Sequence, residues 1–74
     1  MNVVKRTMRD KIRLALTTND ALTQREMFSY ISKKLDSDVT IITFYLTLRV
    51  MVNEGLVLKS GDQYSYKSVT TGLL

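Results

Sequence analysis

Apolar residues recur at helical spacing near the start of the chain. Val4, Met8, Ile12 and Ala15 follow one another at intervals of three or four residues. In an α-helix this spacing places side chains on one face. The pattern therefore predicts a first helix over residues 3–17 with one buried side.

A turn-rich segment, TTNDA, separates this helix from a second one. Thr23 is followed three residues later by Glu26, which is the spacing of a capping box. The second helix is therefore expected over about residues 24–34. Its expected core residues are Met27, Ile31 and either Phe28 or Tyr30.

The third helical pattern follows a short polar turn, in which Ser37 or Asp38 is the expected N-cap. It continues to about Glu54, with Gly55 at the position after the helix where glycine is favoured. On a helical wheel one arc of about 100° is apolar, the width of a core-facing stripe. The residues of this arc are Ile41, Phe44, Leu48, Met51 and Val52.

After Gly55 the apolar period changes from helical to alternating. Residues 56–59 and 63–67 are predicted to be two short strands that flank the turn Ser60-Gly61-Asp62. Tyr64 and Tyr66 then lie on one face of the second strand. The pattern indicates a β-hairpin whose aromatic face packs inward.

Three helices followed by a hairpin resemble the winged helix-turn-helix superfamily. The matching segments are LTQREMFSYI in the second helix, the turn over residues 36–38, and LTLRVMVNEGLV from the third helix into the hairpin. The resemblance implies an α+β winged helix: a three-helix bundle with a C-terminal two-stranded β-hairpin wing. The domain would span residues 1–67, with a C-terminal tail over residues 68–74. The small size resembles regulators of phages, plasmids or archaeal elements.

Composition narrows the possible functions. The chain has neither histidine nor cysteine, so it lacks the usual general base and the thiolate metal ligands. An enzyme, a metal site or a bound cofactor is therefore not expected, and no small-molecule ligand is evident. No apolar run has the roughly 20 residues of a membrane span, and we expect a cytoplasmic protein.

The formal net charge of +4 favours an anionic partner such as nucleic acid. Basic residues gather near the N-terminus, where Arg6, Arg9 and Arg13 share one helical face. This face is either a solvated surface or a strip that contacts phosphate. Asp36 and Asp38, in contrast, lie near the start of the third helix, where they would repel phosphate unless they serve as caps.

The resemblance implies that the third helix enters the major groove of DNA and that the wing touches the backbone. A stripe of threonines on this helix could contact bases or phosphates, or could be exposed without such a role. With basic residues from the second helix and the wing, the predicted contacts to double-stranded DNA are Gln24, Arg25, Thr40, Thr43, Thr47, Arg49, Lys59 and Lys67.

A third stripe of the same helix holds Ile42, Leu46, Arg49 and Asn53, and its apolar residues do not suit DNA binding. One possibility is that the first helix and the C-terminal tail cover this stripe. The other is that the stripe lies in an interface with a second copy or another protein. The expected function is a small, homodimeric DNA-binding transcriptional regulator. The alternative is a protein-interaction module, an adaptor or a phage-encoded inhibitor. The possible interface residues are the two apolar residues of this stripe and the two valines that flank it: Val39, Ile42, Leu46 and Val50.

Overall fold

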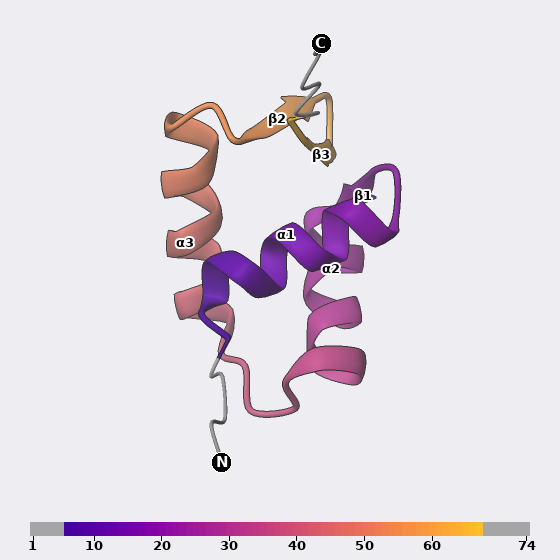
Figure 1. Cartoon of the computed structure of the whole chain (residues 1–74), viewed down its shortest axis with the longest axis vertical. Coiled ribbons are helices and arrows are strands. Elements are labelled where there is room, and N and C mark those ends of the chain that lie inside the picture. Colours follow the sequence, from indigo (N-terminus) through magenta and orange to yellow (C-terminus); the bar gives the residue numbers. More distant parts are fainter. Residues whose placement is uncertain (1–5, 68–74) are drawn as a thin grey trace, which may run out of the picture.

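The computed structural model describes residues 6–67, and their path is shown in Figure 1. These residues form three α-helices, one π-helical turn and three short strands. In chain order the elements are α1 (Met8–Thr18), β1 (Leu22–Thr23), α2 (Gln24–Tyr30), the π-helical turn η1 (Ile31–Leu35), α3 (Ile41–Asn53), β2 (Val57–Ser60) and β3 (Gln63–Tyr66).

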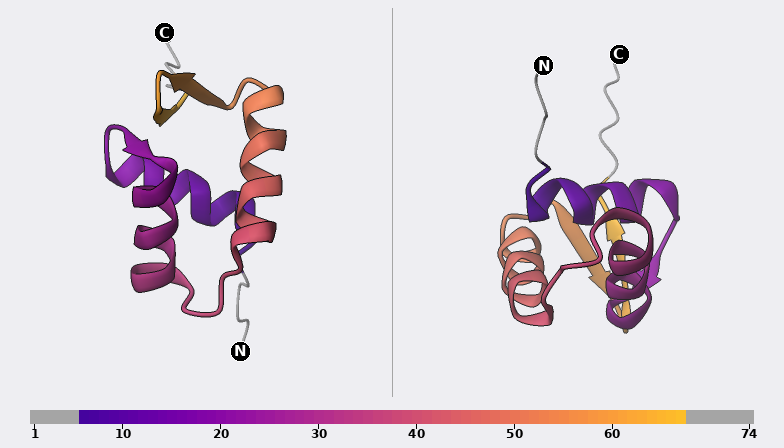
Figure 2. Two further views of the ribbon diagram at one scale, coloured as in Figure 1. Left: turned by 180° about the vertical axis from the view of Figure 1, so that it is seen from behind. Right: turned by 90° about the horizontal axis from the view of Figure 1, so that it is seen from below.

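Helix α1 lies across one side of the molecule, and α2 and α3 flank each other on the opposite side (Figure 2). The hairpin β2–β3 lies beyond the C-terminal end of α3 (Figure 1). The three strands form one antiparallel sheet in the order β1-β3-β2. The architecture is thus α+β, as the sequence predicted, and is compatible with a small winged-helix-like domain. No helix within residues 6–67 is long and apolar enough to cross a membrane.

Helix α1 begins later than the predicted residue 3. Thr7 is its N-cap and forms a capping box with Asp10, in which each side chain accepts a hydrogen bond from the other residue's backbone N–H. Capping boxes satisfy amides that have no partner inside the helix. The helix therefore begins at Met8, and Val4 lies outside the described residues.

Helix α2 has the predicted capping box of Thr23 and Glu26. Its α-helical part ends at Tyr30, and the chain continues as the π-helical turn η1. The backbone N–H of Asp36 donates to the carbonyl of Ile31, five residues earlier, at 2.8 Å, which is the π-helical spacing. The predicted helix over residues 24–34 is therefore present, but its last turn is wider than an α-helical one.

The predicted N-cap of the third helix was wrong. Ser37 and Asp38 lie in a turn in which a carboxylate oxygen of Asp36 accepts from the Asp38 amide at 2.9 Å. Thr40 is the N-cap instead, and its hydroxyl accepts from the amide of Thr43. Because the Asp36 carboxylate keeps residue 38 in this turn, α3 begins only at Ile41.

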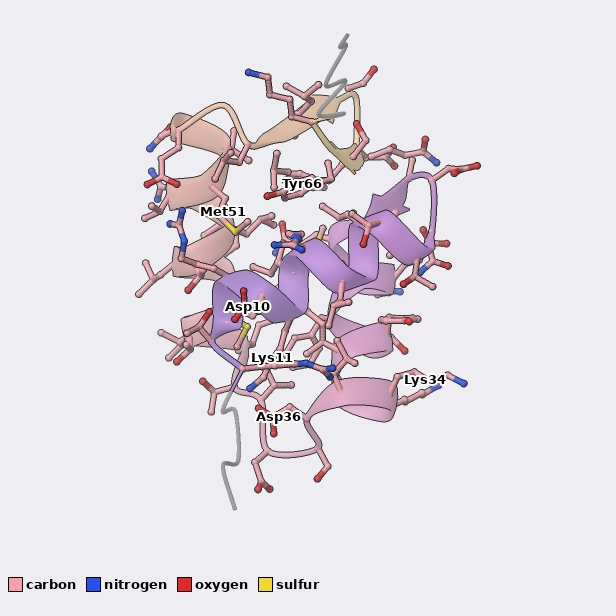
Figure 3. The ribbon with its side chains drawn as sticks, viewed as in Figure 1. Asp10, Lys11, Lys34, Asp36, Met51 and Tyr66 are labelled. Atoms are coloured by element: carbon pink, nitrogen blue, oxygen red, sulfur yellow. The ribbon has the colours of Figure 1, made fainter. Side chains whose placement is uncertain are left out.

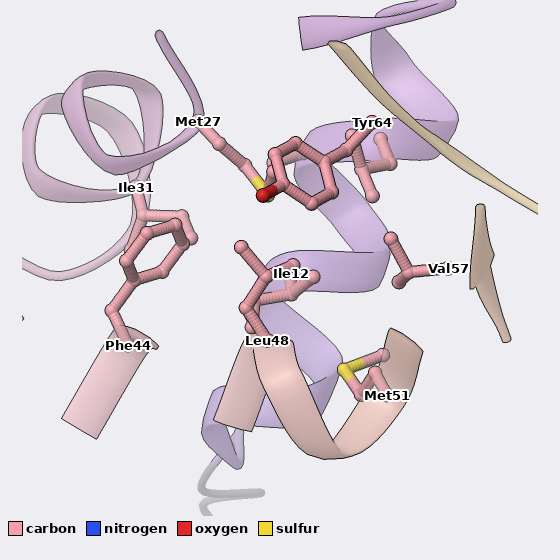
Figure 4. Close-up of a cluster of buried hydrophobic side chains, with 10 residues drawn as sticks. Ile12, Met27, Ile31, Phe44, Leu48, Met51, Val57 and Tyr64 are labelled. Atoms are coloured by element: carbon pink, nitrogen blue, oxygen red, sulfur yellow. The ribbon is translucent and has the colours of Figure 1, made fainter. Parts of the chain in front are cut away.

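The core lies where α1, α2, α3 and the hairpin meet (Figure 4). Phe44, Leu48 and Met51 of α3 are buried there, as predicted, and Phe44 meets Phe28 edge to face at 5.5 Å between ring centroids. The expectation that Ile41 is buried was wrong, since it is 51% exposed. Ile41 is the first residue of α3, and the neighbouring elements leave its side chain uncovered there. The buried set is Ile12, Ala15, Leu16, Met27, Ile31, Phe44, Leu48, Met51, Val57 and Tyr64.

The hairpin has a shorter turn than predicted. Ser60 pairs with Gln63, which leaves Gly61 and Asp62 as the only two turn residues. Gly61 has a φ of +62° at the first turn position, which suits glycine in a two-residue hairpin of type II′. Tyr64 is buried and Tyr66 packs against the core, so the predicted inward aromatic face is confirmed.

Candidate nucleic-acid interface

A polar stripe runs along α3 beside the hairpin. Tyr45, Arg49 and Asn53 follow one another at intervals of four residues, which aligns their side chains on one edge of the helix. A groove of about 380 Å³ lies between this edge and the hairpin, which contributes Lys59 and Tyr64. Leu48 and Val52 complete its floor. Side chains from two elements therefore form a concave surface with two basic groups.

The two basic groups of this groove lie close to aromatic rings. The Arg49 guanidinium lies 6.0 Å from the centroid of Tyr45, and the Lys59 ammonium lies 5.8 Å from that of Tyr64. Such cation–π contacts hold a charged group in place without neutralising it. No acidic residue is found among the described residues that line the groove. The groove is therefore a positively charged, partly preorganised surface.

Several acidic side chains have structural roles away from the groove. Asp10 and Glu26 belong to capping boxes, Asp36 pairs with Lys11, and Glu54 pairs with Arg9. Within residues 6–67, neither Arg49 nor Lys59 takes part in an ion pair. Both cations thus remain available to an anionic ligand.

The basic face predicted on α1 is altered by one of these ion pairs. Arg9 donates to the Glu54 carboxylate at 2.8 Å and so connects α1 to the end of α3. The hydrogen bond and the charge of Glu54 raise the pKa of Arg9 above its ordinary value. Arg13 is exposed on the same helix, and Arg6 is exposed just before the N-cap Thr7, outside the helix. The strip of three arginines therefore includes one arginine that is already neutralised.

The second ion pair joins α1 to the turn before α3. The Lys11 ammonium donates to a carboxylate oxygen of Asp36 at 2.8 Å, and both side chains are mostly covered, as Figure 3 shows. This hydrogen bond, together with the one from the Asp38 amide, lowers the pKa of Asp36 below its ordinary value of 3.8. The charge of Asp36 is thereby compensated at the entrance to α3.

This ion pair predicts an acid-dependent loss of stability. Because the pKa of Asp36 is lower in the folded chain than in the unfolded chain, its contribution is fully present above about pH 5. The contribution falls as the pH drops below 3.8 and through the folded-state pKa. Thermal melting of the wild type and Asp36→Asn between pH 2 and 7 should show a difference in midpoint at neutral pH that shrinks toward pH 2. A difference that is independent of pH would contradict this assignment.

The predicted DNA contacts lie on separate surfaces. Arg49 and Lys59 share the groove described above. Arg25 lies with Lys33 and Lys34 along the outer side of α2 and η1. Gln24 is half-buried at the start of α2, and Lys67 is exposed after β3.

The threonines have positions that the sequence did not indicate. The Thr40 hydroxyl donates to the hydroxyl of Thr43 at 2.9 Å, so both take part in capping α3. Thr47 lies on the side of α3 that faces the start of α1. The threonine stripe therefore lies away from the groove, and its contact with DNA stays a prediction.

Asn53 was absent from the predicted site, although it lines the groove with Arg49. Tyr45 was likewise absent from the predicted contacts, although it lines the groove as well. The four-residue spacing of Tyr45, Arg49 and Asn53 is a signal that could have grouped them. The proximity of Lys59 could not have been found this way, because it depends on how the hairpin folds back.

Of the four predicted interface residues, three form an exposed stripe. Ile42, Leu46 and Val50 are 69%, 56% and 46% exposed. Val39 instead is half-buried and packs against the core. Val39 precedes α3 and is not part of this exposed surface, whereas Ile41, which was predicted to be buried, adds to it at 51% exposed.

No cluster of three or more potential metal-ligating side chains was found within residues 6–67. Comparisons of the chain with protein-family models, with curated proteins and with solved structures found no match.

Proposed function

We propose that this chain is a small DNA-binding transcriptional regulator of the winged helix-turn-helix type that acts in the cytoplasm. The observation that supports this proposal is the groove between α3 and the hairpin, where Arg49 and Lys59 converge and no acidic residue is present among the described lining residues. Phosphate neutralisation by such cations supplies much of the affinity of proteins for nucleic acid.

The groove residues suit different parts of a DNA duplex. Arginine can form a bidentate contact to guanine, and asparagine can form one to adenine, in the major groove. Arg49 and Asn53 lie one helical turn apart on the same edge of α3. In this proposal that edge faces the bases, while Lys59 on β2 contacts the adjacent phosphate. Ile42 and Leu46 precede Arg49 and Asn53 by seven residues, so in this proposal they approach the DNA on the same face of α3.

The proposal predicts a salt-sensitive affinity for duplex DNA. Each neutralised phosphate contributes a slope of about −0.9 in a plot of log K against log salt. With two to four phosphate contacts, raising the salt from about 50 to 200 mM should weaken binding roughly 10- to 100-fold. Fluorescence anisotropy with a labelled mixed-sequence duplex measures this change. Absence of binding at 50 mM salt would contradict the proposal.

A protein-interaction module, an adaptor or an inhibitor, is the second candidate function. The observation that favours it is the exposed stripe of Ile42, Leu46 and Val50. Contiguous apolar surface of this kind is typical of interfaces. The two candidate functions use overlapping parts of α3, because Ile42 and Leu46 precede Arg49 and Asn53 by seven residues and so lie on the same face of the helix.

A further inference from the structure

The face of α3 that points away from the core carries apolar and polar side chains together. The core side of the helix holds Phe44, Leu48 and Met51 (Figure 4). The opposite side holds four exposed residues, whose directions at 3.6 residues per turn lie within about 60° of one another. A ligand that covers this face therefore contacts both kinds of side chain. The four residues are Ile42, Leu46, Arg49 and Asn53.

The polar half of this face determines which kind of ligand fits it. Arg49 lines the groove together with Lys59 of the hairpin, and no ion pair within residues 6–67 neutralises either cation. A purely apolar partner surface would cover the Arg49 charge without supplying a counter-charge, which is costly. Charge complementarity therefore favours an anionic ligand such as duplex DNA over an apolar protein surface.

The apolar half of the face determines which base pairs fit it. The base edges in the major groove present hydrogen-bond donors and acceptors, and the apolar group among them is the 5-methyl group of thymine. An isoleucine or leucine placed against another base edge removes water from a polar group without replacing its hydrogen bond. Ile42 and Leu46, which are 69% and 56% exposed, therefore gain most where thymine methyl groups lie.

The two halves are offset along the helix. Ile42 precedes Arg49 by seven residues, and Leu46 precedes Asn53 by the same interval. Seven residues correspond to about 10 Å of helix. Because successive bases of a strand are about 3.4 Å apart, a helix that lies along the groove covers about three base pairs over this distance. The apolar half should thus meet base pairs about three steps away from those that the polar half contacts.

We propose that α3 recognises thymine, with the side chains of Ile42 and Leu46 against thymine 5-methyl groups in the major groove. The inference rests on the proposed DNA-binding function and adds the class of sequence that is bound, a run of A·T pairs beside a G·C pair. Arg49 contacts the guanine of that pair. The exposed apolar residues of this face then contribute to sequence preference rather than to a protein interface.

Uracil-containing DNA tests this proposal, because uracil is thymine without the 5-methyl group. The probe is a labelled duplex of about 20 base pairs in which single G·C pairs, in both orientations, separate runs of about four A·T pairs. It is synthesised once with thymine and once with uracil, so that charge and base pairing are the same. By fluorescence anisotropy at about 50 mM salt, the wild type should bind the thymine duplex roughly 4- to 15-fold more tightly, the gain from burying one or two methyl groups.

Substitutions link this preference to the face of α3. The double variant Ile42→Ser/Leu46→Ser should bind the two duplexes within about 2-fold of each other, and Leu46→Ser alone should give an intermediate ratio. The matched control is Leu58→Ser, which removes a side chain that is 50% exposed from the strand face opposite to Lys59. This control should keep the wild-type ratio. Circular dichroism confirms that each variant is folded.

Arg49→Ala separates the two halves of the face. It should weaken binding to both duplexes and leave the ratio of the two affinities close to that of the wild type, because it removes no contact to a methyl group.

The outcomes distinguish thymine recognition from DNA binding itself. Equal affinity of the wild type for the two duplexes would overturn thymine recognition, leave the DNA-binding proposal standing, and favour a protein as the ligand of Ile42 and Leu46. A thymine preference that persists in the double variant would overturn the assignment to this face. No binding to either duplex would overturn the DNA-binding proposal and this inference with it.

Discussion

Replacing Phe44 with alanine is expected to lower the free energy of unfolding by about 3–5 kcal/mol. Phe44 is fully buried at the centre of the core, and its ring contacts Phe28 edge to face. Its removal loses the apolar burial and this aromatic contact, and leaves a cavity among side chains of three helices. Because a domain of this size is stable by only about 5–10 kcal/mol, the variant should be close to unfolding at 37 °C.

Urea denaturation followed by circular dichroism measures this loss. The matched control is Ile42→Ala on the same helix, where the side chain is 69% exposed. At low micromolar protein the control should change the free energy of unfolding by less than about 0.5 kcal/mol. Similar losses for the two variants would contradict the assignment of Phe44 to the core and of Ile42 to the surface.

Replacing Arg49 with alanine is expected to weaken binding to duplex DNA by roughly 5- to 100-fold, the range for loss of a specific arginine contact. Arg49 is positioned on the groove by the Tyr45 ring, and no ion pair within residues 6–67 neutralises it. Lys59→Ala should act differently, because a phosphate contact carries no sequence information. It should weaken binding to all duplexes alike and reduce the salt slope by about 1.

The matched control for Arg49 is Arg13→Ala. This change removes the same charge from an exposed position on α1, which lies on the other side of the molecule (Figure 2). Anisotropy titrations should show a loss of less than about 3-fold for Arg13→Ala. Equal losses for the two variants would mean that net charge, rather than the groove, determines the affinity.

The parts of the fold that depend on local sequence could be predicted. The Thr23–Glu26 capping box, the buried stripe of α3 and the hairpin follow from spacings within one element. The Thr7–Asp10 box could also have been found, because it has the same spacing with a shorter acid. The local sequence was sufficient to predict these features, because the residues that define each one lie within a single helix or hairpin.

Features that depend on distant residues could not be predicted. Helix α3 begins at Ile41 because Asp36 holds the preceding turn, and Asp36 itself is held by Lys11 from another helix. Strand β1 has only two residues and forms because β3 pairs with it. The groove likewise depends on the hairpin bringing Lys59 beside α3. Sequence periodicity describes one helix or strand at a time, so it does not indicate which residues of different elements come into contact.

The central claim is that DNA binds at the groove between α3 and the hairpin. Nuclear magnetic resonance of ¹⁵N-labelled protein, with and without a short duplex at low salt, tests it most directly. The account predicts that the largest changes in chemical shift occur at Tyr45, Arg49, Asn53 and Lys59, with little change along α1. Changes confined to α1 or to Arg25, Lys33 and Lys34, or no change at saturating DNA, would contradict it.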